Sequence, residues 1–495
     1  MAVMASPVLV ALVAVTSSVL GEATPISLRE AVSAAIGRNP TLGVSAADRI
    51  AAEGRARSAA GIDDFVIDAA LNWVESRKTL DPSDPLQVPA LDQIDASLSV
   101  TRYLPSGGRV ALRLSHEFAA TTFSTLEDGK EISRSLSRIH LPALRLTVAH
   151  PLLRGLGVRV ARAGLRRARV QGNVASLQRQ AALLDILRQV VIGYWELLYA
   201  QEELAIRQTA AQAARDQLAV VRANIDTGKL PASASAEVEV TIALRDEEAQ
   251  LAEQTLADRS LELRRLAFLD IGPDQILLRA TVDLEALPEL PSMAEIAETL
   301  RQRNPELAAA RTQQETSIVD LDVARNGLLP QLDLTVSGGP SGFSPDAATA
   351  YSQLGRFNSY SVDAALVFQY PIRQRLARGA YQAAGGALRS AQLRVSEVQA
   401  QLLARLGRML AAAVTARQRI DILAPATAAA NLDLEAQRAR FAVGRATNFD
   451  VLRRQQGLAL AQLHQVRARV DYLDALAAIE ALTGDILDRF GVTLR

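Results

Sequence analysis

Six segments of the chain alternate between apolar and polar residues. In residues 94–103 the even positions from Ile94 to Val100 are apolar, and the odd positions from Asp95 to Thr101 are polar. Similar alternation occurs in 65–73, 110–114, 144–148, 332–336 and 360–370. A period of two is typical of β-strands with one apolar and one polar face. The pattern predicts either a half-buried soluble sheet or a barrel wall between lipid and water.

Long stretches of the chain have the pattern of coiled-coil helices. Residues 154–226 contain no Pro. Apolar residues advance by four and three, interrupted only by Gln201, at Leu183, Leu187, Val190, Tyr194, Leu197 and Leu204. A helix over 154–225 would be about 108 Å long at about 1.5 Å per residue. We expect the shorter helices 41–61 and 232–270 to stack end to end beside it. In the second half, 305–326 and 446–484 would lie beside 379–443. Two separate helical bundles are the alternative.

The chain is a duplicated unit. A Ser-x-x-Glu pattern followed by Arg-Asn-Pro begins at Ser27 and again at Ser292, and RANIDTG at 222–228 corresponds to RARFAVG at 438–444. The spacing is longer in the first copy, which predicts an insertion within 62–169. The expected organisation is a first repeat at 24–270 (β segments 62–150, helical hairpin 154–270), a linker at 271–291, a second repeat at 292–486 (helix 305–326, β segments 330–371, hairpin 379–484) and a tail at 487–495.

The N-terminus indicates export. Residues 8–15 are apolar but too few to span a bilayer, and small residues follow up to Ala23, which predicts a signal peptide at 1–23. No Lys or Arg precedes Arg29, so the usual positive start is missing, and a buried N-terminal helix is the alternative. No other apolar run reaches about 18 residues, so the mature protein would enter a membrane only as strands. Export together with strand segments of about 9 to 11 residues favours an outer-membrane wall over a soluble sheet.

Composition excludes several classes of protein. Lys+Arg and Asp+Glu both number 54, so the chain lacks the excess of cations that a nucleic-acid partner requires. Without Cys there is no disulfide, thiol nucleophile or lipid-anchored export. The four histidines, at His116, His140, His150 and His464, lack metal-ligand spacing. No Gly-rich phosphate loop or GxSxG motif occurs either, so the sequence offers no recognisable catalytic or metal-binding motif.

The order of motifs resembles the TolC-like outer-membrane efflux protein family over nearly the whole mature chain. SLREAVSAAIGRNP is followed by strands ending in HPLLRGLG or QYPIRQR, and then by long helices that turn at RANIDTGKLPAS and RFAVGRATNFDVL. The resemblance implies a mainly α fold with a transmembrane β-barrel contribution: a homotrimer sharing one β-barrel in outer-membrane lipid and one long periplasmic α-helical barrel. It implies a passive exit duct of a tripartite efflux or type I secretion system, docked through a periplasmic adaptor onto an inner-membrane transporter of the RND or ABC type. The resemblance further implies no enzymatic activity and no cofactor.

The first half departs from the family pattern of two strands per half. Residues 62–150 contain four alternating segments, with Pro105-Ser106-Gly107-Gly108 as a tight turn between the middle pair. One hypothesis is an extra hairpin that gives six strands per chain and a wider barrel. The alternative is an extracellular or periplasmic ornament on a four-stranded contribution.

The turns between the long helices, at 224–237 and 441–453, are the candidate functional site. The resemblance implies that these tips close the pore and meet the adaptor, through Gly228, Lys229, Leu230, Gly444, Ala446 and Thr447. Asp450 matches an acidic position that faces the lumen in the family, and three copies would form an anionic ring. An ordinary acidic residue in a first helical turn is the alternative. Phe441, Ala446 and Arg453 do not match the family's lock residues, so a latch would pair Arg445 or Arg453 with Glu237 or Asp226.

A second class of function remains compatible with the same patterns. A periplasmic coiled-coil adaptor or structural protein with a soluble sheet would also have long helices and alternating strands. Extraction separates the two, because a duct requires detergent whereas an adaptor is released by osmotic shock. The cargo, whether drug, metal ion or polypeptide, is not encoded in a passive duct, which takes its specificity from the pump.

Overall fold

The computed structural model describes residues 23–78, 86–127, 130–135, 138–272, 276–281 and 287–492. The expected signal peptide lies outside the described residues up to residue 22. The chain forms two compact units. The helical unit takes its residues from Met1–Arg49, Ala175–Ala309 and Val395–Arg495, and the sheet unit from Ile50–Val174 and Ala310–Arg394.

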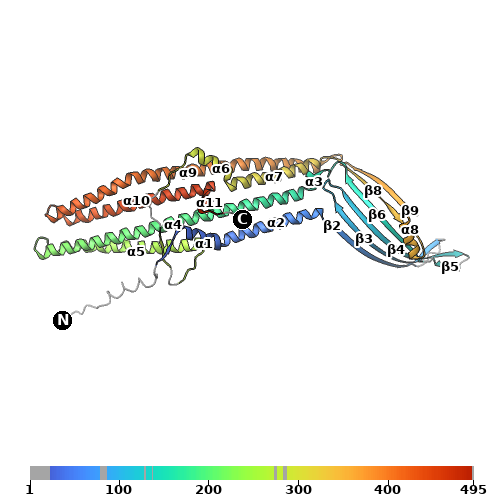
Figure 1. Ribbon diagram of the computed structural model, residues 1–495, viewed down its shortest axis with the longest axis horizontal. Helices are drawn as coiled ribbons and strands as arrows, with labels where there is room; N and C mark the ends of the chain where they lie inside the picture. The colour runs from blue at the N-terminus through green and yellow to red at the C-terminus, as the bar shows by residue number, and fades with distance from the viewer. Residues whose placement is uncertain are drawn as a thin grey trace, which may run out of the picture. The chain divides into compact units, whose positions relative to one another are not determined.

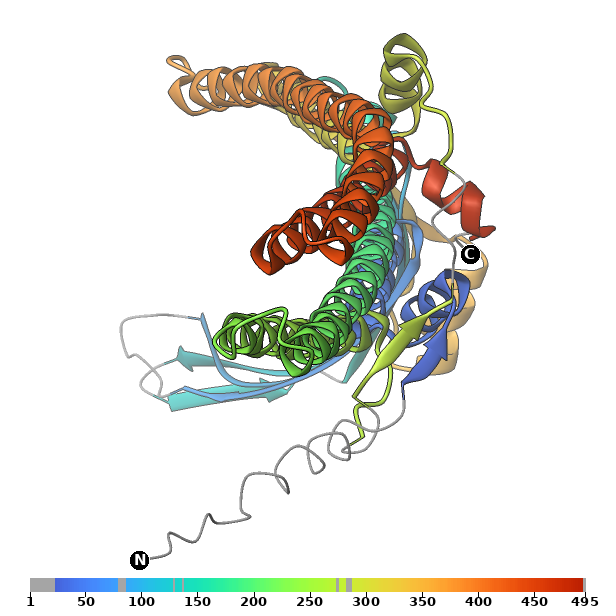
Figure 2. The same ribbon diagram turned by 90° about the vertical axis from the view of Figure 1, so that its left-hand side faces the viewer.

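Four long helices dominate the helical unit. The helices of the chain are α1 (Leu28–Arg38), α2 (Pro40–Ala60), α3 (Val158–Ala161), α4 (Ala163–Asp226), α5 (Ala234–Ala267), α6 (Met293–Arg303), α7 (Pro305–Asn326), α8 (Ala347–Gly355), α9 (Arg375–Ala442), α10 (Asn448–Thr483) and α11 (Asp485–Phe490). Within the helical unit, α4, α5, α9 and α10 lie side by side in one curved layer (Figures 1 and 2). Ion pairs join α4 to α5 along their length, including Arg207–Glu248 at 2.9 Å and Arg222–Glu239 at 3.0 Å.

Two apolar clusters hold this layer together. The larger cluster surrounds Leu187 and Tyr194 of α4 and includes residues of α1, α5 and α10. The second joins α6 and α9 to the opposite side of α10 around Leu402 and Leu406. Tyr194 is fully buried, and its hydroxyl donates to the carbonyl of Ile26 at 3.3 Å. Since α10 contributes to both clusters, it fastens the second hairpin to the first.

The duplication is visible in the local structure. Helices α1 and α6 begin with the same capping box, in which Ser27 pairs with Glu30 and Ser292 with Glu295. The linker between the repeats contains the short strand β7 (Leu278–Ala280), which pairs in parallel with β1 (Thr24–Ile26). Three-residue strands carry no periodicity, so the sequence pattern did not predict this pair.

The long helix of the first repeat starts later than expected. The pattern predicted a helix from residue 154, whereas α3 begins at Val158 and α4 at Ala163. Gly155 and Gly157 have φ of 90° and 98°, which a right-handed helix does not allow. Helix α7 contacts α9 as expected, through Arg405–Glu306 at 3.4 Å in its first turn. It also contacts α4, because Gln313 accepts a hydrogen bond from Gln171 at 3.2 Å.

The sheet unit is built on one antiparallel sheet. Its strands are β2 (Phe65–Arg77), β3 (Leu86–Tyr103), β4 (Arg109–Glu127), β5 (Lys130–Ser135), β6 (Ile139–Pro151), β8 (Gln331–Ser341) and β9 (Ser359–Gln369). They are ordered β2-β3-β4-β6-β8-β9, with β5 paired to the distal end of β4. All six expected segments therefore belong to one sheet (Figure 1). Among the described residues, no helix is long and apolar enough to cross a membrane.

The two faces of the sheet differ in chemistry. One face is apolar, and along one row it presents Ile67, Val100, Leu112, Leu146 and Val362. The opposite face carries polar pairs, such as Arg145 with Asp363 at 2.7 Å. Large apolar side chains on the first face are solvent-exposed, among them Ile67 at 69% and Trp73 at 69%. A sheet face with large apolar side chains exposed in this way is typical of contact with lipid.

Helix α8 was not predicted. It lies against β6 and β8 on the apolar face of the sheet. Its Tyr351 stacks on the ring of His116 with ring centres 5.4 Å apart, and the Tyr351 hydroxyl lies 3.1 Å from Nδ1 of His116. The nine-residue helix is too short to leave a periodic signal.

Candidate gate at the tips of the helical hairpins

Both hairpins reverse through the same backbone turn. Gly228 and Gly444 each have φ of 73°, a left-handed conformation that costs little without a Cβ. Gly228 donates to the carbonyl of Ile225 at 2.8 Å, and Lys229 donates to that of Asn224 at 2.8 Å. In the second tip Gly444 donates to Phe441 at 3.0 Å and Arg445 to Arg440 at 2.8 Å. Both are Schellman motifs, which satisfy the last carbonyls of α4 and α9.

The two tips differ in how the return helix begins. Thr447 caps α10, and its hydroxyl and backbone amide donate to Oδ2 of Asp450 at 2.6 and 3.0 Å. The Asp450 amide donates back to the Thr447 hydroxyl at 3.3 Å, which completes a capping box. The hydrogen bonds from the Thr447 side chain and then from its backbone lower the pKa of Asp450. Helix α5 of the first tip has no side-chain cap at Ser233.

Asp450 therefore acts locally as an acidic residue in the first turn of α10. This role is the alternative to a gate residue that the sequence left open. The two roles are compatible, because the capping box uses the carboxylate in its charged form and leaves the side chain only partly buried. The capping contacts fix where that charge lies. A gate built on Asp450 would thus have a preorganised position.

A small apolar cluster, the tip cluster, joins the hairpins next to the turns. Val221 of α4 and Val238 of α5 are 0% exposed, and Leu452 of α10 is 6% exposed. Leu230 and Phe441 pack on them from the two turns. Leu230, predicted as an adaptor contact, is therefore partly buried within the chain. Gly228, Lys229, Gly444 and Thr447 are exposed, and Ala446 is intermediate.

A buried amide pair also connects the tips, and the sequence pattern missed it. Nε2 of Gln217 on α4 donates to Oδ1 of Asn448 on α10 at 2.9 Å. Both residues are buried, each at 7% exposure. A buried amide pair is favourable only when its partners stay aligned, so it holds the two hairpins in register at the tip. The only feature of the sequence that could have indicated this pair is the presence of polar residues, Gln217 and Asn448, within the apolar seam of the helices.

The charged gate candidates are exposed and do not pair with one another in the chain. Arg445, Arg453 and Glu237 are all solvent-exposed. Among the described residues, no ion pair joins either arginine to Glu237 or Asp226; the ion pairs closest in sequence are Arg222–Glu239 at 3.0 Å and Arg454–Asp433 at 3.1 Å. The expected latch is thus not formed within one copy of the chain.

Replacing Gly444 with Ala should destabilise the second tip. A Cβ at φ of 73° is expected to cost about 1 to 2 kcal/mol. The control is Gly457→Ala, because Gly457 lies inside α10 with nothing within 4 Å of an added Cβ, and there Ala should stabilise by up to about 1 kcal/mol. Thermal unfolding of the purified protein in detergent measures both. Equal unfolding temperatures for the two variants would contradict the assigned turn geometry.

A half-buried charged cluster lies farther along the helices, and the sequence pattern missed it too. This wall cluster consists of Glu196 on α4, Arg419 on α9, and Arg467, Asp471 and Asp474 on α10. Arg467 binds Glu196 at 2.9 Å and Asp471 at 2.7 Å, and Arg419 binds Asp471 at 2.8 Å. The Arg467 guanidinium also lies 5.1 Å from the ring centre of Tyr199.

The wall cluster occupies the face of the helical layer opposite the β1–β7 sheet. Tyr194 and Tyr472 hydrogen-bond toward that sheet and the inter-repeat linker, through Ile26 and Pro288. Glu196 and Asp474 each lie two residues farther on, which is about 200° around a helix.

Asp474 has the most strongly perturbed acidity in the wall cluster. Burial, and then the neighbouring carboxylate of Glu196, raise the pKa of Asp474 to about 8, against the attraction of Arg467. Its Oδ1 is buried without a hydrogen-bond partner among the described residues. The cluster therefore contains a carboxyl group that stays protonated near neutral pH.

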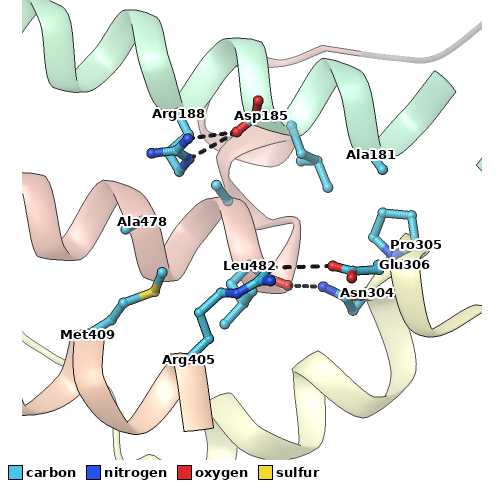
Figure 3. Close-up of a pocket in the computed structure, with 12 residues that line it drawn as sticks. Ala181, Asp185, Arg188, Asn304, Pro305, Glu306, Arg405, Met409, Ala478 and Leu482 are labelled. Atoms are coloured by element: carbon cyan, nitrogen blue, oxygen red, sulfur yellow. Dashed lines mark hydrogen bonds and ion pairs between the residues drawn. The ribbon is translucent and has the colours of Figure 1, made fainter. Parts of the chain in front are cut away.

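A shallow pocket at the α6–α7 junction has a structural explanation (Figure 3). Its residues come from α4, the α6–α7 junction, α9 and α10. Asn304 donates to the carbonyl of Leu482 at 2.9 Å, and its Oδ1 accepts from the amide of Leu307 at 3.0 Å. Asp185 pairs with Arg188, and Glu306 with Arg405, so these charges are already satisfied. In the part of the chain that is described, no cluster of His, Cys, Asp and Glu is suited to hold a metal ion.

Comparison with known proteins defines the class. Residues 296–485 match the outer membrane efflux protein family model. The pyoverdine export outer membrane protein OpmQ of Pseudomonas putida is 26% identical over 336 residues, which are 65% of this chain and 67% of that protein.

Solved structures show the same fold. VceC of Vibrio cholerae is 16% identical, with a TM-score of 0.63 over 92% of this chain and 96% of that one. The open-state MtrE channel of Neisseria gonorrhoeae is 15% identical, with a TM-score of 0.65 over 92% and 88%. The CmeC channel of Campylobacter jejuni is 14% identical, with a TM-score of 0.64 over 92% and 85%.

The fold is therefore that of an outer-membrane channel, and the resemblance seen in the sequence is confirmed. The second repeat matches the outer membrane efflux protein family, and the fold is that of TolC-like outer-membrane channels. The chain is an outer-membrane protein of efflux, and its family and fold are those of channels.

Proposed function

We propose that the protein is a homotrimeric, passive exit duct whose periplasmic end is gated at the helix tips. The observation that carries this proposal is one chain with both a sheet face of exposed apolar side chains and long helical hairpins. The sheet suits a wall in the outer membrane, since its polar side chains gather on the opposite face. The hairpins suit a wall that is wet on both sides, which explains the balanced charge.

The organisation of the chain as two repeats fits this role. We propose the boundaries 24–270 and 292–486, with 271–291 as an equatorial connection and 1–23 as a signal peptide. The parallel pairing of β1 with β7 supports the equatorial assignment, because it ties the start of the first repeat to the linker. No catalytic group is needed for passive conduction, so we propose no enzymatic activity.

The tips are the proposed contact for a periplasmic adaptor, which would connect the duct to an inner-membrane transporter of the RND or ABC type. The turns at Gly228 and Gly444 are exposed and have the same backbone geometry, so each chain offers two equivalent contact sites. Their matching Schellman geometry supports recognition of both by the same kind of partner surface. Since the duct supplies no selective pocket in this proposal, the cargo follows from the transporter.

Extraction tests the proposed function against the periplasmic adaptor alternative. The duct should stay with the outer membrane during osmotic shock, dissolve only in detergent, and migrate as a trimer on a mild gel. Release as a soluble monomer by osmotic shock would refute the duct. The exposed apolar side chains of β2, such as Ile67 and Leu71, are the physical reason for the expected need for detergent.

The gate role of Asp450 is tested by separating its charge from its capping contacts. Asp450→Asn removes the charge and can still accept the Thr447 hydrogen bonds, so we expect the cation preference in a planar bilayer to fall by on the order of twofold. Thr447→Ala weakens the capping box and keeps the charge, so the ion preference should be retained. An unchanged preference in Asp450→Asn would remove Asp450 from the gate, and a loss in Thr447→Ala alone would assign the effect to helix capping.

A further inference from the structure

The β3–β4 hairpin lies in the middle of the sheet. Every residue of β2 pairs with β3, and β4 pairs with β6 from Arg109 to Ala119. An ornament would attach at an edge or leave β2 beside β6. Instead β2 and β6 have no pairing with each other among the described residues, and the hairpin occupies the whole space between them.

The faces of the sheet continue through the hairpin without a break. Leu98 on β3 and Leu114 on β4 continue the apolar face between Ala69 of β2 and Leu144 of β6. On the polar face Arg113 donates to Ser97 at 3.0 Å. The hairpin thus has the same lipid-facing and water-facing sides as its neighbours, which is a requirement for a place in a membrane wall.

Beyond the neighbouring strands the hairpin continues as a projection. Pairing of β3 with β4 continues as far as Leu86 opposite Thr125. The pairing of β6 with β4 extends only to Ile139, the first residue of β6, which lies opposite Ala119. The distal part of β4 pairs with β5 instead. The two sequence hypotheses therefore apply to different parts of the hairpin: its base belongs to the sheet and its end extends past it.

The two edge strands of the sheet are open and complementary. Each of β2 and β9 has one neighbour, and all their residues but Ser76 are exposed along their whole length. Unpaired strand edges are not tolerated in lipid, so each must meet another edge. Strands β2 and β9 are the first and last of six successive antiparallel strands, so they run in opposite directions. The β9 edge of one copy therefore runs antiparallel to the β2 edge of the next.

We propose that the β2 edge of each copy pairs with the β9 edge of a second copy, and that the trimer closes an eighteen-stranded exit. This inference rests on the trimeric duct proposed above. Barrel diameter grows roughly linearly with strand number, so the exit is about half again as wide as a twelve-stranded wall of three four-stranded chains. Barrels of about 16 to 18 strands leave an aqueous channel. The membrane exit then passes bulky hydrophilic cargo that a twelve-stranded exit would exclude.

The strand registers of the sheet define a deletion that removes the hairpin alone. Val74 aligns with Gln93, Gln93 with Ala119, and Ala119 with Ile139. Joining Glu75 to Arg138 through Asn-Gly therefore places β2 beside β6 with both faces preserved and four strands per chain. The matched control joins Ala120 to Arg138 through Asn-Gly, which removes the distal part of β4 together with β5 and keeps six strands.

The decisive measurement is a strand count of the unmodified trimer in lipid nanodiscs by electron cryo-microscopy. Eighteen strands with β9–β2 pairing between copies are expected. A trimer with twelve strands and the hairpin outside the wall would overturn this proposal while leaving the duct intact, whereas the absence of a trimer would refute the duct itself.

Polymer exclusion provides the functional readout. Neutral polymers of graded size are added to the side of a planar bilayer that faces the distal strand ends. The largest polymer that enters should be about a third smaller in radius for the deletion than for the parent, and unchanged for the control. An equal size limit in all three proteins would overturn the proposed width.

Discussion

Replacing Arg467 with Met should strongly lower the free energy of unfolding of the protein. Arg467 neutralises Glu196 and Asp471, whose side chains are 15% and 28% exposed. Removing one member of a buried ion pair leaves uncompensated charge and typically costs about 3 to 5 kcal/mol. Because Arg467 itself is 36% exposed, we expect the free energy of unfolding to fall by about 3 kcal/mol.

Unfolding of the purified protein in detergent measures this loss, and the buried Trp195 is a native fluorescent probe in the helical unit. The matched control is Arg454→Met, since the Arg454–Asp433 pair is exposed on both sides and should contribute less than about 1 kcal/mol. Identical losses in the two variants would show that the wall cluster has no special role in stability.

Asp474→Asn should have the opposite effect and stabilise the protein at alkaline pH. The carboxyl group has a pKa of about 8 in the folded chain against a usual value of 3.8. Between these values the folded state holds a proton that the unfolded state releases, so stability falls as pH rises from about 4 to about 8. Asn carries no ionisable group and removes this loss, by on the order of a few kcal/mol above pH 8.

The pH profile distinguishes this mechanism from a general change in packing. The unfolding temperature of Asp474→Asn should match that of the parent near pH 4 and exceed it increasingly up to about pH 8. Asp433→Asn, at an exposed ion pair, is the control and should show no such divergence. A constant difference at every pH would indicate that Asp474 is ionised in the folded protein.

These two variants also bear on function, because in the proposed trimer the wall cluster lies on the pore side of the helical layer. The face that carries β1 and β7 is occupied by α1, α6 and α11, as Figure 2 shows. The opposite face would line the duct. A carboxyl group that titrates near neutral pH on that face would make the local charge of the duct depend on pH.

The sequence predicted the regular elements well where periodicity was long. The early helix of the second repeat was expected at 305–326, which are the bounds of α7. The start of the first long helix was wrong because Gly155 and Gly157 adopt left-handed φ, which the apolar period does not encode. Helix α8 and strands β1 and β7 were missed because elements this short are fixed by tertiary contacts rather than by a repeating pattern.

The candidate site was only partly accessible from the sequence. The glycines of both tips could be predicted because a tight reversal requires a left-handed residue, and Gly228 and Gly444 have that conformation. The capping box at Thr447 follows from a short local motif. The Gln217–Asn448 pair and the wall cluster join residues far apart in the chain, and polar residues on a helix are normally assigned to its solvated face. Only the packing of the two hairpins brings them together.

The position of the β3–β4 hairpin has a consequence for how such a protein can change over time. Since the hairpin enters and leaves the sheet at one level, a stretch of chain can be gained or lost there without altering the outer edges or the helices. In a threefold assembly each such event changes the circumference by six strands at once. The width of the exit would then evolve in discrete steps, through insertion of whole hairpins, while the helical hairpins stay constant.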